Sequence, residues 1–256
     1  MTVKTLEEIM KLKEGGGKLA AILEIIKKET KPGVSTMELD KMAEQLILKE
    51  GGVPSFKGYK GGKDAVPFPA TMCISVNDEV VHGMPGKKIL KEGDIVGLDI
   101  GMKYKGLFTD MAETVIVGNS KEKDPAGDKL VKVTKESLEL AISVIRPGLK
   151  TGDLGNIIQS FIEAHGFGVV RQLVGHGVGH AVHEEPQIPN WGTAGEGVPL
   201  KENMVIAIEP MVTEGDYNLC IADDGWTWKT KDGSRAAHFE HTMAVKKDGA
   251  EVLTSI

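Results

Sequence analysis

Four carboxylates in this sequence occupy positions suited to chemistry. Asp99 and Glu209 each directly follow a four-residue stretch of apolar residues and glycine, and Asp110 and Glu240 are polar residues within other strand-like segments. Gathered in one buried place, four carboxylates would repel one another and have raised pKa values unless cations neutralised them. One strand-end carboxylate is more often a solvated charge or a turn former. The set of four, and not any single member, therefore indicates metal binding.

A histidine completes this set of candidate ligands. His176 lies in Gly175-His-Gly-Val-Gly179, where glycines on both sides allow main chain or substrate to approach the ring closely. One imidazole with four carboxylates suits two divalent ions, with Mn, Fe, Co and Zn as the candidates. Two such ions about 3.5–4 Å apart can hold a hydroxide nucleophile at neutral pH and polarise a carbonyl. The predicted chemistry is hydrolysis of an acyl bond.

The candidate ligands recur at matching places in two halves of the chain. Asp99 matches Glu209 and Asp110 matches Glu240, while His176 has no counterpart. The matched segments follow the same order in each half: Pro32–Leu39 with Pro147–Leu154, His82–Pro85 with His183–Pro186, Lys91–Asp99 with Lys201–Glu209, and Phe108–Val115 with Phe239–Val245. We interpret this as an internal duplication, approximately residues 5–118 and 124–246, within a single catalytic domain spanning residues 1–256. The two halves would be related by a pseudo-twofold axis near which the paired residues meet.

Two helices are predicted at the start of each half. Apolar residues at helical spacing predict a helix that begins after Thr5, with Glu8 completing a capping box, and that ends at Pro32. Three consecutive glycines at 15–17 indicate either a kink in this helix or a close contact with another backbone. A second helix begins at Ser35 with Glu38 and ends before Gly51. The same pair recurs at approximately 130–145 and 151–166.

The remaining segments predict an α+β fold. The predicted strands are 94–102, 107–117, 169–173, 205–211, 220–221 and 237–245, and the predicted loops are 51–70 and 186–199. Helices that come in pairs before strands favour helices packed on one side of a curved, mostly antiparallel sheet over regular βαβ winding.

Composition excludes several classes of function. The chain has 256 residues, a net charge of −6, 41% hydrophobic residues and two cysteines, Cys73 and Cys220. The negative charge argues against direct nucleic-acid specificity, and no apolar run approaches the roughly 20 residues of a membrane span. Two cysteines cannot form a disulfide framework or a four-cysteine zinc site. With no targeting signal in the first residues, we expect a cytoplasmic protein. We also expect it to be a monomer.

With these residues placed, nearly the whole chain resembles the type I methionine aminopeptidases. The resemblance implies the pita-bread fold, a dinuclear metal site and removal of the initiator methionine from nascent polypeptide N-termini when the second residue is small, with the ribosome as a candidate partner. The motifs that carry it are Cys73-Ile-Ser-Val-Asn-Asp-Glu-Val-Val-His-Gly-Met-Pro85, Gly93-Asp-Ile-Val-Gly-Leu-Asp-Ile-Gly101, Gly175-His-Gly-Val-Gly179, His183-Glu-Glu-Pro186, Ile208-Glu-Pro-Met211 and Phe239-Glu-His-Thr242.

The resemblance also implies roles for the metal ligands. Asp110 and Glu240 would bridge both ions, Asp99 would chelate one, and His176 with Glu209 would complete the other. Glu209 would further act as the acid and base that carries a proton from the bridging water to the leaving amine.

Two more histidines receive catalytic roles by the same resemblance. His82 would assist binding and turnover near the substrate's N-terminal amine, and His183 would contact the scissile carbonyl. His180 and His241 match no catalytic position, and we expect structural roles for both.

A soft apolar pocket would receive the methionine side chain, and its matching positions are Tyr59, Cys73, Val182 and Trp226. Trp228 is a further candidate for the same wall. The sequence departs from the family pattern at Val182, which stands where an aromatic residue is frequent, and at residues 61–67, where the loop is longer.

Three alternatives are weighed against this interpretation. Proline-specific dipeptidases and aminopeptidases share the ligands and the glycine-flanked histidine, but usually carry an additional N-terminal domain for which this chain leaves no room. A type II methionine enzyme would have a helical insertion in the second half, and none is visible. A binding module that has lost its metals would not be expected to keep all five ligand positions.

Overall fold

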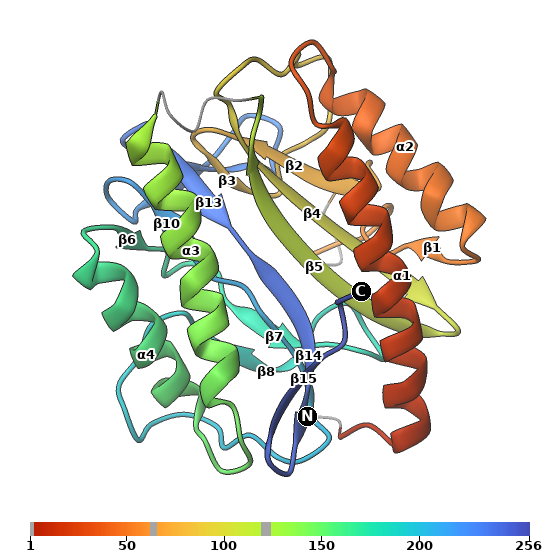
Figure 1. The fold of residues 1–256 in the computed structure, drawn as a ribbon, viewed down its shortest axis with the longest axis vertical. Helices are drawn as coiled ribbons and strands as arrows, with labels where there is room; N and C mark the ends of the chain where they lie inside the picture. The colour runs from red at the N-terminus through yellow and green to blue at the C-terminus, as the bar shows by residue number, and fades with distance from the viewer. Residues whose placement is uncertain (1–2, 62–65, 119–123) are drawn as a thin grey trace.

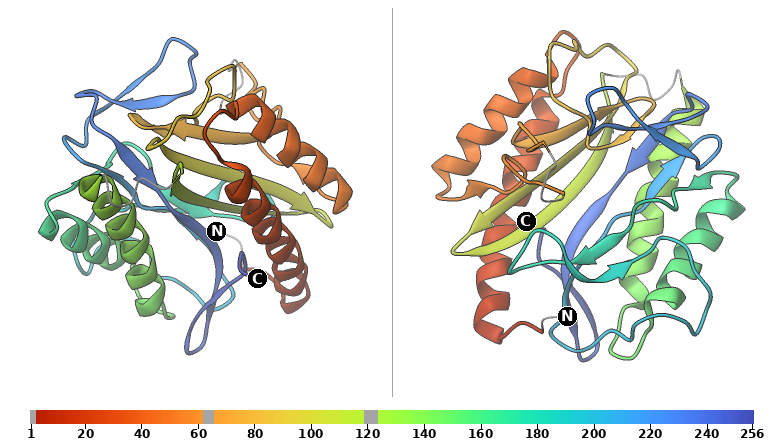
Figure 2. Two further views of the ribbon diagram at one scale, coloured as in Figure 1. Left: turned by 45° about the horizontal axis from the view of Figure 1, so that its top comes forward. Right: turned by 180° about the vertical axis from the view of Figure 1, so that it is seen from behind.

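Four long helices lie on one side of a curved sheet in the computed structural model, which describes residues 3–61, 66–118 and 124–256 (Figures 1 and 2). Helices α1 (Leu6–Glu29) and α2 (Thr36–Lys49) cover one part of the sheet, and α3 (Pro125–Val144) and α4 (Thr151–Ala164) cover the other. Within these described ranges, no helix is long and apolar enough to cross a bilayer.

The central sheet has nine strands, arranged β1-β4-β5-β14-β9-β7-β8, with β15 added to β14 and β2 added to β4. Two three-stranded sheets, β13-β10-β6 and β11-β12-β3, adjoin it. Every strand pairing in the described ranges is antiparallel. The strands are β1 Val53–Pro54, β2 Met72–Val76, β3 Glu79–Val81, β4 Ile95–Tyr104, β5 Leu107–Ile116, β6 Gly168–Val169, β7 Gly175–Gly177, β8 Glu184–Ile188, β9 Val205–Ile208, β10 Met211–Thr213, β11 Leu219–Ile221, β12 Trp228–Thr230, β13 Ala236–His238, β14 Glu240–Lys246 and β15 Gly249–Val252.

The helix starts predicted at Thr5 and Ser35 are confirmed, whereas α3 begins at Pro125, before the start predicted near residue 130. Thr5 with Glu8 and Ser35 with Glu38 form capping boxes at the starts of α1 and α2, which satisfy backbone N–H groups that have no partner within the helix. Helix α1 runs without a break through its glycine triplet. A Cβ on Gly16 would lie 2.2 Å from the backbone oxygen of Leu253, so the triplet marks a close backbone contact with the C-terminal segment.

Each helix pair has its own core against the sheet. Leu23, Leu39 and Leu98 are among the residues buried between the first helix pair and the sheet. Leu130, Ile158 and Ile206 belong to the equivalent cluster under α3 and α4. Burial of these apolar side chains removes them from water and fixes the helices to the outer face of the sheet, which leaves the opposite face for the site.

The turns between the paired helices have the same geometry in both halves. Gly33 and Gly148 each have a φ of 91°, in the left-handed region that glycine adopts without strain. The N–H of Gly33 donates to the Leu90 carbonyl at 2.8 Å, and the N–H of Gly148 donates to the Leu200 carbonyl at 2.9 Å. The fold class predicted from sequence, two αα plus β halves around a curved antiparallel sheet, is confirmed.

Several predicted boundaries were wrong. The strand expected at 169–173 is limited to Gly168–Val169, and the loop expected at 186–199 begins with the end of β8. The strands expected at 205–211 and 237–245 are each interrupted, at Glu209-Pro210 and at Phe239 respectively. Proline has no N–H for a ladder hydrogen bond, which accounts for the first interruption. Of the longer loop expected at 61–67, residues 62–65 lie outside the described ranges.

Candidate metal centre

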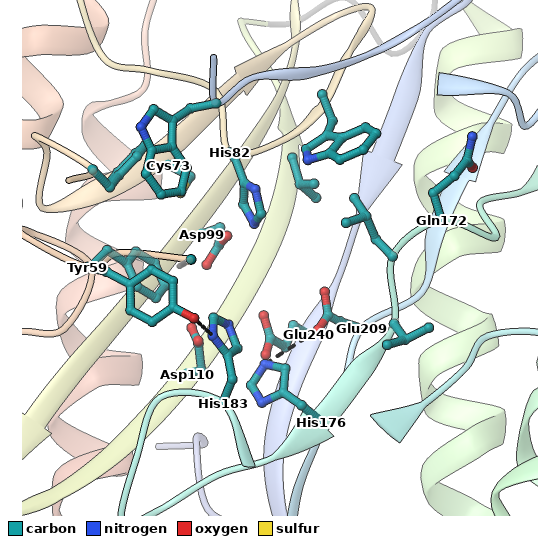
Figure 3. A pocket seen from close by; sticks show the side chains of 18 of the residues that line it. Tyr59, Cys73, His82, Asp99, Asp110, Gln172, His176, His183, Glu209 and Glu240 are labelled. Atoms are coloured by element: carbon teal, nitrogen blue, oxygen red, sulfur yellow. Dashed lines mark hydrogen bonds and ion pairs between the residues drawn. The ribbon is translucent and has the colours of Figure 1, made fainter. Parts of the chain in front are cut away.

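The first two carboxylates lie on neighbouring strands that form a hairpin. In the register of β4 and β5, Asp110 lies opposite Gly101 and Asp99 lies opposite Ala112. Residues two apart on a strand share a face, so Asp99 and Asp110 are diagonal neighbours on the same face of the sheet. Both side chains point into the cavity shown in Figure 3.

Glu240 is brought to this pair by the adjacent strand β14. It lies opposite Ala112 of β5. The buried hydroxyl of Thr242 accepts from the N–H of Asp110 at 2.9 Å and donates to its carbonyl at 2.7 Å. These two bonds fix the register between the strands that carry Asp110 and Glu240.

Glu209 lies where the chain passes from one sheet to another. Strand β9 pairs with β14 in the central sheet, whereas β10 pairs with β13 in a small sheet. The interruption at Glu209-Pro210 therefore faces the interruption at Phe239, whose N–H donates to the Pro210 carbonyl at 3.3 Å. Such irregularities in a ladder redirect side chains, and here the side chains of Glu209 and Glu240 line the same cavity.

His176 is held by β7, which pairs with both β8 and β9. Its flanking glycines are required by close strand contacts, since a Cβ on Gly177 would lie 2.4 Å from the Glu185 carbonyl oxygen. The Nδ1 atom lies 2.9 Å from the Gly177 carbonyl, and donation there leaves Nε2 as an acceptor. Nε2 is directed toward Glu209 Oε1 at 3.5 Å.

The electrostatics of the carboxylates are unfavourable without a cation. Burial raises the pKa of Asp99 from 3.8 to about 7 and the pKa of Glu209 from 4.5 to about 8. Burial, followed by the nearby carboxylates, also raises the pKa of Asp110 and of Glu240 well above the ordinary range. Within the described part of the chain, no lysine or arginine forms an ion pair with any of the four.

The donor set fits divalent metal ions. Oδ1 of Asp99, Oδ1 of Asp110 and Oε1 of Glu240 are buried and have no hydrogen-bond partner among the described residues. Buried polar atoms are normally satisfied, so three carboxylate oxygens that lack a hydrogen-bond partner beside one cavity indicate a binding site for cations. Donor atoms of Asp110, His176 and Glu240 also lie within 4.8 Å of one another, close enough for one ion.

Two more histidines lie beside this centre. His82 has a φ of 56°, and its ring lies edge-on to Trp226, with the centroids 6.5 Å apart. Burial, followed by His183 and then another nearby histidine, lowers the pKa of His82 to about 4. His183 Nδ1 lies 2.7 Å from the Tyr59 hydroxyl, and its ring is edge-on to His176 at 4.5 Å (Figure 3). Burial, followed by the charge of His183, lowers the pKa of His176 to about 3.

A cavity of about 400 Å³ connects these groups with an apolar wall. Tyr59, Cys73 and Trp226 line it, as the sequence predicts, together with Trp228. Val182 is buried in the same apolar cluster but is not among the lining residues in the described ranges. The structure thus brings the predicted ligands, both predicted histidines and the predicted pocket to one place.

Three of the residues that sequence reasoning missed at this site bear on its chemistry. Phe56 and Phe68 line the cavity, and Phe68 packs edge-on against Trp226 with the centroids 5.3 Å apart. Both come from the segment 51–70, where aromatic residues in a glycine-rich loop were the available signal. The third is His238, which is buried beside Glu240; its position two residues before a predicted ligand, on the same face of an extended chain, was the available signal.

His180 and His241 have partners away from the centre. His180 Nε2 lies 2.6 Å from Glu8 Oε1 at the start of α1. His241 Nδ1 lies 3.0 Å from the hydroxyl of Thr254. These contacts connect the histidines to the terminal segments of the chain.

Comparison with known proteins shows the family to which the chain belongs. Metallopeptidase family M24 matches residues 10–247. The methionine aminopeptidase of Mycoplasma capricolum is 46% identical over 254 residues, covering 99% of this chain and 98% of the relative. The crystal structure of the methionine aminopeptidase of Thermotoga maritima superimposes with a TM-score of 0.95 at 47% identity, covering all of both chains.

A more distant match shares the fold. The prolidase of Pyrococcus furiosus has a TM-score of 0.77 at 23% identity, and the match covers 99% of this chain and 65% of the prolidase. The pita-bread fold is therefore common to these enzymes, whereas high identity over the full length is found with the methionine aminopeptidases. The chain belongs to metallopeptidase family M24 and, within it, to the methionine aminopeptidases.

Proposed function

We propose that this enzyme removes the N-terminal methionine from nascent proteins and peptides whose second residue is small. The observation that carries the proposal is a single cavity that joins an apolar, aromatic wall to orphaned buried carboxylates. The wall suits a flexible thioether side chain, and the carboxylates suit ions that act on the adjoining amide.

The five predicted ligands would hold two divalent ions. We assign Asp110 and Glu240 to both ions, Asp99 to one, and His176 with Glu209 to the other. Ions bound there would supply a nucleophilic water at neutral pH and polarise the scissile carbonyl. Support comes from the shared face of Asp99 and Asp110 and from the Nε2 atom of His176, which its Nδ1 contact leaves free to bind metal.

The surrounding side chains would bind the substrate and move the proton. Glu209 would take the proton of the attacking water and deliver it to the leaving amine. His183, oriented by the Tyr59 hydroxyl, would donate to the scissile carbonyl. His82 would contact the substrate near its N-terminal amine, and burial keeps it neutral at physiological pH by lowering its pKa. Tyr59, Cys73, Val182 and Trp226, with Phe56 and Phe68, would form or support the methionine pocket.

The metal requirement can be tested directly. Protein treated with chelator should lose release of methionine from Met-Ala and Met-Gly peptides, and it should regain that activity with Mn²⁺ or Co²⁺. Full activity in a chelated sample shown by elemental analysis to be free of metal would refute the proposal.

Substrate choice separates this function from that of a proline-specific peptidase. The fold likeness to prolidase makes the comparison necessary, although at 23% identity it concerns the fold alone. We expect faster cleavage of Met-Ala peptides than of Xaa-Pro peptides in which Xaa is not methionine. The opposite order would favour the proline-specific function.

We also propose that residues 1–256 act as one catalytic domain formed by the internal repeat at approximately 5–118 and 124–246. The equivalent glycine turns at Gly33 and Gly148 support this division. We expect the protein to act as a monomer in the cytoplasm, near the ribosome where new N-termini emerge. Size-exclusion chromatography with light scattering measures the first expectation, and sedimentation with ribosomes measures the last.

A further inference from the structure

One buried histidine at the metal centre has no role in the function proposed above. His238 is 2% exposed, and its Nε2 atom has no hydrogen-bond partner among the described residues. That atom lies 3.6 Å from Glu209 Oε2 and 3.9 Å from Glu240 Oε2. A buried ring nitrogen without a partner is unfavourable, and this one faces two proposed ligands.

The backbone around His238 is fixed on both sides. In the small sheet it lies opposite Met211, two residues beyond Glu209. Its N–H donates to the hydroxyl of Thr114 at 2.9 Å, and the same hydroxyl donates to its carbonyl at 2.7 Å. Held by β10 and β5, the ring is placed beside the carboxylates by the register of the strands.

The distances suit a shared ion better than a direct hydrogen bond. A nitrogen–oxygen hydrogen bond is about 2.7–3.2 Å long, and both separations from His238 Nε2 exceed this. Ligand atoms about 2.0–2.2 Å from one ion lie roughly 3–4 Å apart when they are neighbours around it. Donor atoms of Glu209, His238 and Glu240 all lie within 4.8 Å of one another.

Glu209 lies between two imidazoles. Its Oε1 atom is 3.5 Å from His176 Nε2, and its Oε2 atom is 3.6 Å from His238 Nε2. Each ring thus faces a different oxygen of the same carboxylate, and each also lies in a donor group with Glu240. An ion away from the two rings would have carboxylates alone.

We propose that His238 is a sixth ligand of the metal centre, binding through Nε2 the ion that Glu209 and His176 hold. This rests on the dinuclear site of the proposed function and adds one ligand to it. The consequence is a nitrogen-rich position beside an all-oxygen position. Because imidazole suits Zn, Fe and Co better than Mn or Mg, the nitrogen-rich position should fill first with these ions.

Nuclear magnetic resonance of the unmodified chain tests the assignment. The protein is labelled with ¹⁵N at histidine, stripped with chelator and given one equivalent of ¹¹³Cd²⁺. We expect one-bond ¹¹³Cd–¹⁵N splitting at Nε2 of both His176 and His238. His165, whose Nδ1 lies 2.7 Å from the Phe161 carbonyl on α4, serves as the internal control without splitting.

The outcomes distinguish this inference from the proposed function. Splitting at His176 but not at His238 overturns the sixth ligand and leaves the proposed metal site intact. No splitting at either histidine refutes both. The splitting is measured on the unmodified chain, and H176Q, H238Q and H165Q are needed only to assign the signals.

Metal affinity provides an independent measurement. Removing a residue that only hydrogen-bonds to a metal ligand weakens metal binding by about 10- to 100-fold. Loss of a ligand itself, in His238→Ala, should therefore weaken Co²⁺ binding by at least about 10-fold in calorimetric titration. The matched variant His165→Ala should bind Co²⁺ as the wild type does. An unchanged Co²⁺ affinity in a folded His238→Ala protein would contradict the proposal.

Discussion

Replacing Asp99 by asparagine should stabilise the metal-free protein at neutral and higher pH. Burial raises the pKa of Asp99 from 3.8 to about 7 in the folded chain. The folded state therefore keeps its proton where the unfolded state has lost it, and the stability gained from that proton is lost as pH rises toward 7. The full shift corresponds to about 4 kcal/mol, of which about 3 kcal/mol falls between pH 5 and pH 8. An asparagine side chain cannot ionise, so the variant escapes this loss.

The assay is urea unfolding in chelator at pH 5, 6, 7 and 8. The wild type should become less stable across this range, and the difference in favour of Asp99→Asn should grow by about 3 kcal/mol. Asp223→Asn, at an exposed loop position, is the matched control and should follow the wild type. Parallel pH profiles for the wild type and Asp99→Asn would refute the account of the carboxylates as desolvated and unpaired.

Added metal should reverse the order of stability. An ion that binds only the folded state stabilises the protein, and the gain increases with the logarithm of the ratio of the ion concentration to its dissociation constant. Because Asp99→Asn removes a proposed ligand, it should gain less from Co²⁺ than the wild type does. With saturating Co²⁺ at pH 8, the wild type should therefore be the more stable protein. If the variant remained more stable, Asp99 would not be a ligand.

Four further substitutions test how the site and helix α1 are supported. Thr242→Val removes two buried hydrogen bonds to the strand that carries Asp110. The free energy of unfolding in urea should fall by about 1–3 kcal/mol, and kcat should also fall. An unchanged stability would contradict this. The buried Lys4 amine lies 2.7 Å from the Glu184 carboxylate, next to His183 in sequence. Lys4→Met removes this cation and should lower the free energy of unfolding by about 3 kcal/mol. A more stable variant would show that the pair is not needed for stability. Gly16→Ala should cost about 1–3 kcal/mol because its Cβ would collide with a backbone carbonyl. In Gly17→Ala the new Cβ would lie 3.6 Å from the backbone oxygen of Ser255, an ordinary contact, so this variant should instead gain about 0.5–1 kcal/mol of stability. Equal thermal shifts for the two variants would refute the packing argument.

The starts of the first two helices and the candidate ligands could be predicted from local sequence signals. Capping boxes at Thr5 and Ser35 depend on side chains three residues apart, so they can be read locally. Asp99 and Glu209 stand out because each ends an apolar stretch, and the internal repeat pairs them. Local spacing and repetition were sufficient because the physical causes, hydrogen bonds within one turn and burial of a strand, act over short stretches of chain.

Which distant groups lie beside the candidate ligands can be seen only in the folded chain. The strands are interrupted at Glu209-Pro210 and Phe239 because the central sheet and a small sheet join there. This junction places His238 beside two carboxylates. The aromatic wall formed by Phe68 and Trp226, and the pairing of Lys4 with Glu184, likewise join residues far apart in sequence. Such contacts depend on strand register and on the packing of loops, which are set by the whole fold and leave no periodic signal in the segments themselves.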